Sequence, residues 1–479
     1  MGLGCFGGGV AATRFLAEHG ARVTVTDLKD KSQLQDSIAR LADVALHAAA
    51  FGEHPDWVFH DCDLLVVSPA VKPDHPSVVR ARGDGVTVTT ELELFCRHNP
   101  APVIAVTGSN GKSTTTALIQ HLLQHSWQNS SRRTWLGGNI GISLLSELPR
   151  ISSDDWVVLE VSSFQLEQLR QNRFRPRIAV ITNFTANHLD WHGDLEAYRR
   201  AKQGILDAQL RSDAAILPST EGNDIDVDWR ARGRIYRFAA GDTGEDGVFA
   251  EEGQLIFRSA AVGVATIDTG GSGRERALAD SGAQTEDALR WNQPPQLPGK
   301  HNAQNIAAAC CAAWLAGGDP ETFSTALQSF VPLPHRLQLV AEREGRRFYN
   351  DSIATTPESA IQALRVFSNR IVLLAGGYDK GQDLTEFSQE IRQRAAVVVL
   401  MGQTAEDLRQ KIVDAAGDRC PVLIIGCDFH DSFCQATAQS HPGDIILLSP
   451  GCASYGWFRD YRERGELFEV LAREWKSEQ

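Results

Sequence analysis

The 479-residue chain contains no apolar run approaching the roughly 18 residues that a bilayer-spanning segment needs. It also has no block rich in Lys and Arg, and 60 acidic residues outnumber 47 basic ones, for a net charge of −13. Nucleic-acid binding relies on basic groups that neutralise phosphates, so nucleic acid is not an expected partner. The first residues lack the charged, apolar and small-residue regions of a signal peptide. These absences favour a cytoplasmic protein that binds no membrane.

Cysteine is sparse, with nine residues and only one adjacent pair. This usage fits a reducing compartment rather than a disulfide framework. Cys420, Cys427 and Cys434 recur every seven residues, a spacing that could be interpreted as a metal site. Because Cys427 follows the apolar run Val422–Gly426, we interpret these three residues as small buried side chains instead.

Three blocks of alternating strand-like and helix-like segments follow one another along the chain, in agreement with a length that suggests about three domains. Polar, Pro-containing segments at 97–102 and 331–336 separate domains predicted at 1–98, 99–332 and 333–479. The nearly continuous apolar strands predict parallel α/β sheets: a Rossmann-like first domain, a central P-loop ATPase-like domain and a Rossmann-like third domain. Residues 242–295 are rich in Gly, Ser and charge, which predicts a hairpin and a long surface insertion.

The most informative segment joins the apolar run Val103–Val106 to a helix-like stretch. It contains Gly108 and then Gly111-Lys112-Ser113, a shortened form of the G-x-x-x-x-G-K-[ST] phosphate loop. The glycines let backbone N–H groups turn towards phosphate, Lys112 can reach the β- and γ-phosphates, and the Ser113 hydroxyl can hold Mg²⁺. A Gly-rich turn with an incidental lysine is the alternative. The strand before it, the helix after it and the hydroxyl favour ATP or GTP binding.

A second glycine pattern, Gly2-x-Gly4-x-x-Gly7, opens the chain, and Asp27 follows twenty residues after Gly7. This spacing is typical of a nucleotide-binding loop whose acidic residue meets a ribose or a nearby polar group. Met1 directly precedes Gly2, which leaves no room for the strand that should lead into the loop. We expect the first strand to be missing, through a truncated start or a fold without it. A helix start built of small residues is the other interpretation.

Polar residues also follow two apolar runs of the second block, where ligands collect in parallel sheets. Glu160 comes directly after Trp156–Leu159 and is well placed to bind Mg²⁺. The residues after Arg177–Ile181 include Asn183, Asn187, His188 and Asp190, and Lys202 lies on the next helix-like segment. A lone histidine is more often structural and a lone lysine more often solvated. Their occurrence together with a phosphate loop points to catalysis.

Taken in order, several segments of the second block resemble the Mur ligases: Thr107 to Thr114 (TGSNGKST), LEVSSFQL, NHLDWHG, AYRRAK and KHNAQN. In the third block LPHRLQ, FYNDSIATTP, LLAGGYDKG and LLSPGCASYGWFRDYRERG are similar to the members that add D-glutamate to UDP-N-acetylmuramoyl-L-alanine. The resemblance spans the chain apart from the 242–295 insertion and the missing first strand. It implies an ATP-dependent amide ligase of peptidoglycan precursor synthesis, acting through an acyl phosphate, with two Mg²⁺ ions, as a cytoplasmic monomer.

The resemblance also implies residue roles. Catalytic roles fall on Lys112, Glu160, His188 and Lys202. ATP would be bound by Gly108, Ser109, Asn110, Gly111, Lys112, Ser113, Thr114, Asn302, Asn305, Arg336 and Asp351. Mg²⁺ would be held by Ser113, Glu160, His188 and Lys202, the last as a carbamate formed with CO₂, which turns a cation into an oxygen ligand. The UDP-linked substrate would contact Gly4, Cys5, Phe6, Asp27, Ser68, Asn139, Ser162 and His188. The amino acid would contact Thr355, Lys380, Ser454 and Tyr461.

The chain departs from the family pattern at a few of these sites. Ile353 stands where members often have the lysine of a DSKAT motif, and an apolar side chain cannot take over a contact to phosphate or carboxylate. Cys5, Phe6 and Ala70 differ from the commonest uridine-site residues, and Tyr461 replaces a common phenylalanine. These differences bear on individual ligand contacts rather than on the reaction.

Three alternative functions remain open from the sequence. Another amide ligase of the superfamily would share the central block, although folylpolyglutamate synthase needs no glycine-rich uridine domain and other Mur ligases lack the ASYGWFRDYRERG-type ending. A nucleotide-binding switch protein would need no second metal site. A dinucleotide-dependent oxidoreductase would leave the phosphate loop unexplained.

Overall fold

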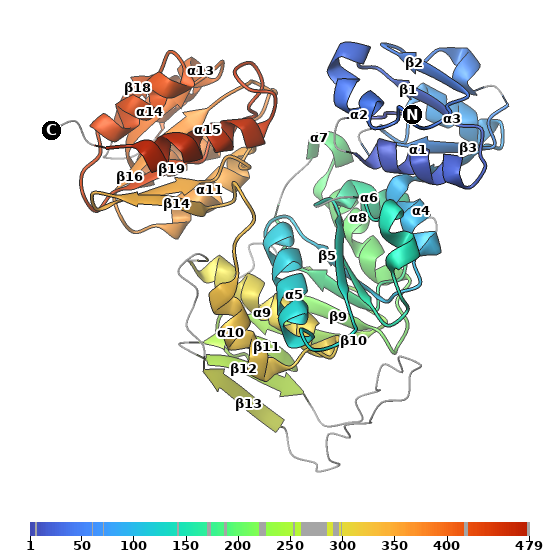
Figure 1. Cartoon of the computed structure of the whole chain (residues 1–479). Coiled ribbons are helices and arrows are strands. Elements are labelled where there is room, and N and C mark those ends of the chain that lie inside the picture. The colour runs from blue at the N-terminus through green and yellow to red at the C-terminus, as the bar shows by residue number, and fades with distance from the viewer. Residues whose placement is uncertain are drawn as a thin grey trace. The chain divides into compact units, whose positions relative to one another are not determined.

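The computed structural model describes residues 1–4, 7–59, 61–69, 71–140, 143–169, 174–185, 189–219, 227–251, 254–259, 285–290, 297, 299–415 and 420–476. The chain divides into two compact units, one of Met1–Asn292 with Gln304–Ser329 and one of Gln293–Ala303 with Phe330–Gln479 (Figure 1). The predicted boundary at 98/99 lies inside the first unit, and the one at 332/333 lies close to the change of unit at Phe330. The three-domain boundaries stay a prediction.

The first unit is α/β, as predicted, and contains two small parallel sheets and one of nine strands. Its strands are β1 (Thr24–Asp27), β2 (Ala48–Phe51), β3 (Leu64–Val67), β4 (Thr87–Thr90), β5 (Val103–Thr107), β6 (Thr134–Gly138), β7 (Trp156–Glu160), β8 (Ile178–Ile181), β9 (Ala214–Pro218), β10 (Arg234–Ala239), β11 (Gly247–Glu251), β12 (Gln254–Ser259) and β13 (Thr285–Arg290). Its helices are α1 (Gly8–Glu18), α2 (Gln35–Ala39), α3 (Pro76–Gly83), α4 (Glu91–His98), α5 (Lys112–Ser126), α6 (Ser163–Leu169), α7 (Leu189–His192), α8 (Leu195–Asp207), most of α9 (Lys300–Leu315) and α10 (Phe323–Ser329).

The chain start links the two small sheets, β1–β2 and β3–β4. The Met1 amino group donates to Val66 O at 2.9 Å, Met1 O accepts from Ser68 N at 3.0 Å, and Gly2 N donates to Thr26 O at 2.8 Å. Burial lowers the pKa of the Met1 amino group to about 6. As expected, none of the described residues before β1 forms a strand, and Met1 with Gly2 hydrogen-bonds to both β1 and β3.

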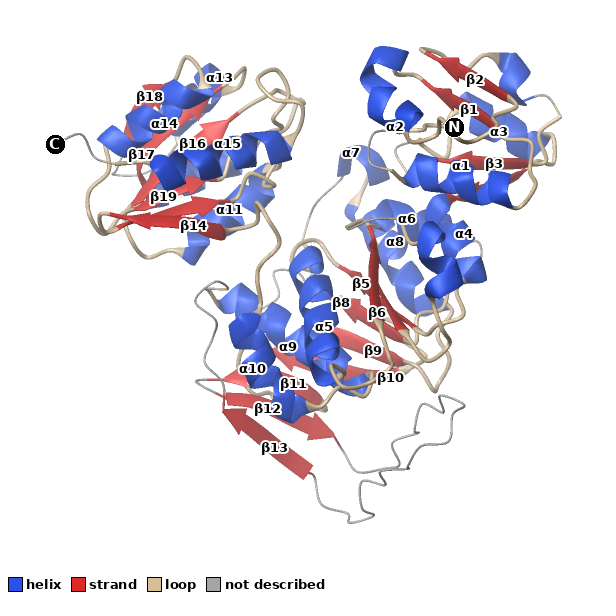
Figure 2. Cartoon of the chain, viewed as in Figure 1, coloured by secondary structure: helices blue, strands red, loops and turns tan. Residues whose placement is uncertain are grey.

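The nine-stranded sheet has the order β13-β12-β11-β10-β9-β8-β5-β7-β6 (Figure 2). The seven strands β5 to β11 pair in parallel, as the continuous apolar sequences of the second block predict. Strand β12 instead pairs antiparallel with both β11 and β13. The β11–β12 pair confirms the hairpin predicted in the 242–295 stretch. Most of the predicted insertion, residues 260–284, lies outside the described residues.

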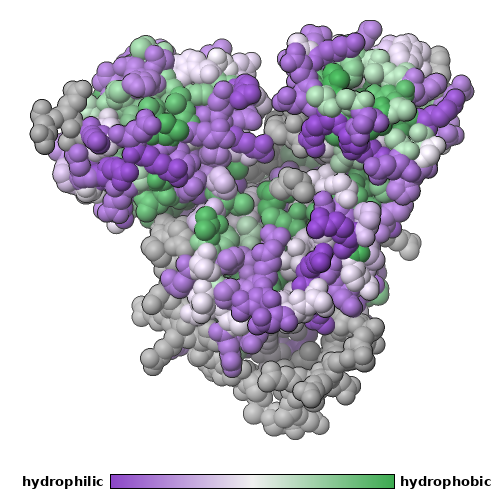
Figure 3. Space-filling model, in the orientation of Figure 1, coloured by the Kyte–Doolittle hydropathy of each residue, from purple (hydrophilic) through white to green (hydrophobic). Residues whose placement is uncertain are grey.

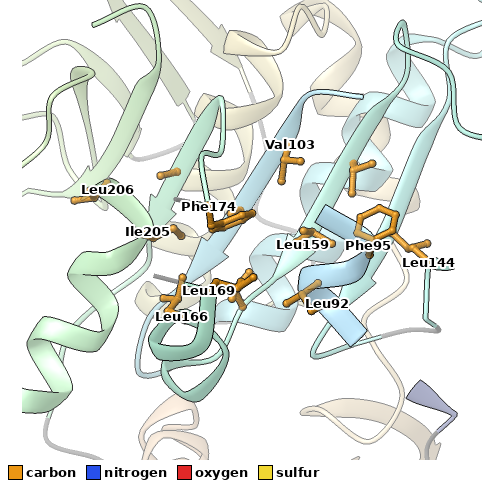
Figure 4. Packing of buried hydrophobic residues seen from close by; sticks show 14 of the residues in the cluster. Leu92, Phe95, Val103, Leu144, Leu159, Leu166, Leu169, Phe174, Ile205 and Leu206 are labelled. Atoms are coloured by element: carbon orange, nitrogen blue, oxygen red, sulfur yellow. The ribbon is translucent and has the colours of Figure 1, made fainter. Parts of the chain in front are cut away.

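One hydrophobic cluster joins the first block of the chain to the nine-stranded sheet. Leu92 and Phe95 of α4 lie in the same cluster as Val103 of β5 and Leu159 of β7 (Figure 4). Phe15 of α1 belongs to it as well. Because these side chains share one core, the loops after β1 and β3 are carried on the same packed body as the phosphate loop.

The second unit contains one six-stranded sheet in the order β14-β15-β19-β16-β17-β18, in which only the β14–β15 pair is antiparallel. Its strands are β14 (Gln338–Arg343), β15 (Arg346–Asn350), β16 (Ile371–Gly376), β17 (Ala395–Met401), β18 (Val422–Ile425) and β19 (Ile445–Leu448). Its helices are α11 (Pro357–Val366), α12 (Thr385–Arg394), α13 (Ala405–Asp414), α14 (Phe429–Ala438) and α15 (Tyr461–Glu474).

Alternate residues of the central strands pack into two separate clusters on the two faces of this sheet. Leu373 of β16 packs with residues of α11, α12 and α13, whereas Leu374 packs with residues of α14 and α15. This is the period of two that a β-strand imposes on its side chains. Both faces are covered by helices (Figure 2), which explains why the strands β16, β17 and β19 are apolar throughout.

The interpretation of Cys420, Cys427 and Cys434 as buried side chains is wrong, because all three are exposed. For Cys420 and Cys427, which flank strand β18, the reason is topological. Strand β18 lies at the edge of its sheet, where Val422 and Ile425 are themselves exposed. An apolar run therefore does not carry its flanking residues into a core when the strand has a neighbour on one side only.

On the face shown in Figure 3, hydrophilic side chains are interspersed with smaller hydrophobic areas. Within the described parts of the chain, no helix is both long enough and apolar enough to pass through a membrane.

Truncation of Leu159 tests the shared core of the first unit. Leu159 is fully buried, whereas Leu210 in the same unit is 49 % exposed and serves as the matched control. We expect Leu159→Ala to lower the free energy of unfolding by about 2–5 kcal/mol, because it removes buried contacts and leaves a cavity. Leu210→Ala should change it by less than about 0.5 kcal/mol. Urea unfolding followed by circular dichroism measures both, and equal effects would contradict the packing.

Candidate functional site

The loop between β5 and α5 needs its two glycines for both conformation and space. Gly108 has φ +152° and Gly111 has φ +78°, values that side chains rarely tolerate. A Cβ added at Gly108 would overlap Thr182 Oγ1, and one added at Gly111 would overlap Asn305 Oδ1. The predicted phosphate loop is therefore closely packed between the end of β8 and helix α9.

The segment after β8 holds this loop through the side chain and backbone of Asn183. Asn110 N donates to Asn183 Oδ1 at 2.8 Å, and Asn183 Nδ2 donates to Asn110 O at 3.1 Å. Ser109 N donates to Asn183 O at 3.1 Å, and Ser109 Oγ donates to Thr185 O at 2.9 Å. Since β5 and β8 are adjacent and parallel, their carboxyl ends bring these residues together.

Two lysines meet at one carbonyl of the loop. Lys112 Nζ donates to Gly108 O at 3.0 Å and to Ser109 O at 2.9 Å, and Lys202 Nζ donates to Gly108 O at 2.7 Å. Lys202 lies on α8 and is only 1 % exposed. Its burial, and next the charge of Lys112, hold the pKa of Lys202 well below its ordinary value. The structure thus brings these two predicted catalytic residues together.

Tyr198 also belongs to this cluster, although the sequence analysis missed it. Its hydroxyl lies 3.2 Å from Ser109 Oγ, and Lys202 Nζ lies 4.4 Å from the centroid of its ring. Tyr198 and Lys202 are four residues apart on α8, so they share one face of the helix. This four-residue spacing was the sequence signal that could have identified Tyr198 as a neighbour of Lys202.

Glu160 lies beside the start of the loop, because Val106 of β5 is its partner in the sheet register. The carboxylate is 1 % exposed, and its Oε1 accepts from Asn139 Nδ2 at 2.9 Å. Its Oε2 is buried and has no hydrogen-bond partner among the described residues. A buried carboxylate oxygen that accepts from no described donor fits a hard divalent cation.

His188, the remaining predicted metal ligand, lies outside the described residues. Within the described ranges, no group of three His, Cys, Asp or Glu side chains could hold a metal ion. Among the described residues, Ser113, Glu160 and Lys202 stay the predicted metal ligands.

Helix α9 places both predicted nucleotide-binding asparagines in buried positions. Asn302 and Asn305 are three residues apart, one helical turn. Thr115 Oγ1, on the first turn of α5, lies 3.4 Å from Asn305 Oδ1. The neighbouring Thr114 is buried as well. Asn305 thus borders the phosphate loop from the side of α9.

The Asp27 carboxylate binds backbone amides at Gly4, near the start of the chain, and at Lys29. Its Oδ2 accepts from Gly4 N and its Oδ1 accepts from Lys29 N, both at 2.8 Å. Ser68, predicted to contact the same ligand, lies against Gly2, where an added Cβ would approach Ser68 Cβ to 2.8 Å. The described candidates Gly4, Asp27 and Ser68 therefore lie at the ends of the small sheets. The other predicted uridine-site positions, Cys5, Phe6 and Ala70, lie outside the described residues.

Asn139 and Ser162 lie on either side of Glu160. Asn139 N donates to Glu160 O at 2.8 Å, in addition to the side-chain hydrogen bond described above. Ser162 N and Oγ both donate to Gln165 Oε1 at 3.0 Å. Two residues predicted to bind the UDP-linked substrate are thus fixed next to a predicted catalytic carboxylate.

The second unit places its predicted ligand residues after the carboxyl ends of neighbouring strands of its sheet. Thr355 follows β15, Ser454 follows β19 and Lys380 follows β16, and these three strands are adjacent and parallel. Backbone hydrogen bonds join the loops, from Asp351 N to Leu448 O, from Gly376 N to Pro450 O and from Tyr378 N to Ala453 O, each 2.8 Å. Tyr461 begins α15, and its carbonyl accepts from Ser352 Oγ at 2.7 Å.

Asp351 holds the segment that carries Arg336. Its Oδ1 accepts from Leu337 N at 3.1 Å and its Oδ2 accepts from Ser449 Oγ at 2.7 Å. Burial raises the pKa of Asp351 to about 7. Arg336 lies between His335 and Leu337, which have φ values of +64° and +41°. These are costly conformations for side-chain residues, and they mark a segment that the surrounding structure holds in place.

Arg464 is a buried residue that the sequence analysis left unassigned within its motif. It donates to Ser352 Oγ at 2.9 Å, to Ser352 O at 2.8 Å and to Cys452 O at 3.3 Å. Burial lowers its pKa to about 10, so it remains charged at neutral pH. A Cβ at the next residue, Gly465, would overlap His335 Nδ1, which explains the glycine. Arg464 therefore joins the loops after β15 and β19.

Models of three Mur ligase domains match nearly the whole chain. The Mur ligase MurD-like N-terminal domain matches residues 1–90, the Mur ligase middle domain matches 106–313, and the Mur ligase glutamate ligase domain matches 335–452. A UDP-N-acetylmuramoylalanine–D-glutamate ligase of Koribacter versatilis is 35 % identical over 97 % of this chain and 95 % of its own. One of Roseiflexus sp. is 38 % identical over 98 % of this chain and 97 % of its own.

Solved structures share the fold at lower identity. The UDP-N-acetylmuramate–alanine ligase MurC of Thermotoga maritima has a TM-score of 0.57 and 20 % identity, covering 98 % of each chain. The MurF ligase of Thermotoga maritima, solved in complex with ADP, has a TM-score of 0.56 and 19 % identity, covering 96 % of this chain and 97 % of its own.

Substitution of Gly111 tests the packing of the phosphate loop. Gly111→Ala should displace Asn305 and weaken ATP binding by about tenfold or more, since the loop amides would leave their places. Gly20 is the matched control, because its φ of +82° resembles that of Gly111 while no atom lies within 4 Å of its added Cβ. Calorimetric titration with ATP should leave the affinity of Gly20→Ala unchanged. Equal losses in both variants would refute the packing argument.

Proposed function

This chain belongs to the Mur ligase family. We propose that the residues around Gly108, and those that follow strands β15, β16 and β19 in the second unit, perform its reaction. The chain is an ATP-dependent amide ligase that adds D-glutamate to UDP-N-acetylmuramoyl-L-alanine in peptidoglycan precursor synthesis. The observation that carries the residue assignment is the meeting of Lys112 and Lys202 at Gly108 O beside the buried Glu160.

The reaction needs an activated carboxylate, because a carboxylate ion is a poor electrophile. Its oxygen attacks the γ-phosphorus of ATP, which releases ADP and forms an acyl phosphate. The amine of D-glutamate then attacks the acyl carbon, and phosphate leaves. Two anions must approach each other in the first step, so positive charge at the phosphates lowers the barrier. Lys112, with the amides of the loop and the start of α5, supplies that charge.

Bound Mg²⁺ would supply further positive charge to the phosphates, with Ser113, Glu160 and His188 as its proposed ligands. Lys202 is proposed to contribute to metal binding as a carbamate. Formation of a carbamate requires a neutral amine that attacks CO₂. The lowered pKa of Lys202 and its burial beside Lys112 support this role, because a carbamate would place an anion beside the Lys112 cation.

The other ligands are assigned to the remaining clusters. ATP is proposed to contact residues 108–114, Asn302, Asn305, Arg336 and Asp351, and the UDP-linked substrate to contact the loops of Gly4, Ser68, Asn139 and Ser162. Thr355, Lys380, Ser454 and Tyr461 are proposed to bind D-glutamate, with Lys380 pairing with a carboxylate. Asp27 acts through the Gly4 loop that it holds. We also propose that the protein acts as a monomer in the cytoplasm, as the family resemblance implies.

The activity is tested by phosphate release from ATP with UDP-N-acetylmuramoyl-L-alanine, Mg²⁺ and a panel of amino acids. We expect release with D-glutamate and none with L-glutamate, L-alanine or diaminopimelate. Omission of either the UDP-linked substrate or the amino acid should abolish net turnover, because each is consumed in the reaction. Turnover with another amine alone would refute the D-glutamate assignment, and release with ATP alone would indicate a plain ATPase.

Substitution of Lys202 tests the proposed carbamate. Lys202→Ala should lower kcat by about 10²-fold or more, because an oxygen ligand for the metal is lost. Short carboxylic acids such as acetate or propionate should restore part of the activity by placing a carboxylate in the vacated space. Arg200→Ala, on the same helix α8, is the control and should show neither effect. Full activity of Lys202→Ala, or loss without rescue, would contradict the carbamate.

A further inference from the structure

Two tyrosines stand exposed beside Lys380 in the second unit. Tyr378 is 37 % exposed and Tyr455 is 49 % exposed, and their ring centroids lie 5.9 Å apart with an interplanar angle of 82°. Lys380 Nζ lies 5.1 Å from the centroid of the Tyr455 ring. This is within the range at which a cation is attracted to the face of an aromatic ring, and the Tyr378–Tyr455 pair has the edge-to-face geometry that aromatic pairs prefer.

The backbone beneath these side chains is held firmly. Tyr378 N donates to Ala453 O at 2.8 Å, and the two residues form a β-bridge between the loops after β16 and β19. A Cβ at Gly377 would overlap Ala453 O, so the loops can approach this closely only with glycine there. Ser454, a proposed ligand of D-glutamate, is buried between Ala453 and Tyr455. The rings therefore stand on a rigid base next to a proposed substrate contact.

The Lys380 side chain itself is exposed, long and flexible, and an ammonium on such a chain samples many positions in water. A ring face that attracts the cation reduces this freedom before substrate arrives, which lowers the entropy lost on binding. We propose that Tyr455 is a positioning residue that holds the Lys380 ammonium where it meets a carboxylate of the amino-acid substrate, with Tyr378 supporting the Tyr455 ring. This inference rests on the proposed role of Lys380 in D-glutamate binding.

The test replaces the ring and measures the Michaelis constant for D-glutamate at saturating ATP and UDP-N-acetylmuramoyl-L-alanine. Tyr455→Leu should raise that KM about two- to fivefold, with kcat and the KM for ATP unchanged, because an exposed cation–π contact is modest. Tyr455→Phe should restore most of the affinity and Tyr455→Trp should equal or exceed Tyr, since Trp attracts cations best. A role in packing alone would not follow this order.

Two controls separate the possible explanations. Trp457→Leu removes another exposed aromatic of the same loop, 40 % exposed, and should leave the KM unchanged. In a Lys380→Met background, Tyr455→Leu should have no further effect, because the ring acts through the ammonium. Where turnover of Lys380→Met is too slow, calorimetric binding of D-glutamate gives the same comparison. Melting temperatures confirm that each variant is folded.

The outcomes are distinct. An unchanged KM in Tyr455→Leu, or a loss that persists in the Lys380→Met background, overturns the inference about Tyr455 while the assignment of Lys380 stands. An unchanged D-glutamate KM in Lys380→Met overturns the assignment of Lys380 and the inference with it, although the ligase activity itself remains. A loss in Tyr455→Leu that Phe and Trp repair, and that vanishes in Lys380→Met, establishes the positioning role.

Discussion

The carbonyl oxygen of Gly108 accepts hydrogen bonds from both Lys112 and Lys202, and this meeting of two amines at one buried acceptor is the contact on which the proposed chemistry of the first unit depends. Burial of the Lys202 amine, and next its repulsion by the nearby Lys112 ammonium, hold the pKa of Lys202 well below its ordinary value. Tyr198 and the end of β8 hold the loop in the shape that makes this contact possible. A loop carbonyl with two lysine donors and a lysine with a lowered pKa thus belong to the same arrangement.

Several charged side chains at the ends of strands make hydrogen bonds to neighbouring loops of the protein itself. Both carboxylate oxygens of Asp27 accept from loop amides, and those of Asp351 accept from Leu337 N and from the Ser449 hydroxyl. Arg464, a buried cation, also bonds to the backbone: it donates to the carbonyls of Ser352 and Cys452. Buried charges need such partners, and here the partners are the loops at the ends of strands. These loops are consequently held in place by the protein itself.

Parallel sheets explain why residues far apart in the sequence gather at the carboxyl ends of neighbouring strands. In both units, the loops that follow neighbouring strands carry the proposed ligand contacts. The topology places β5 between β7 and β8, so Glu160, the phosphate loop and Asn183 meet although they are distant in sequence. In the second unit, β19 lies between β15 and β16, which brings Ser454 between the loops of Thr355 and Lys380.

The strand, glycine loop and helix around Gly108–Ser113, the parallel α/β class and the places of Glu160 at the end of β7 and Lys202 on α8 could be predicted from the sequence, because apolar runs and glycine spacing are local signals. Motif resemblance identified the D-glutamate-adding members in the same way. The exposure of Cys427 could not be predicted, since it depends on β18 being an edge strand. The contacts of Tyr198, Arg464 and Tyr455 also required the tertiary structure. A side chain's partners are set by strand order and loop packing, which join residues that no local pattern connects.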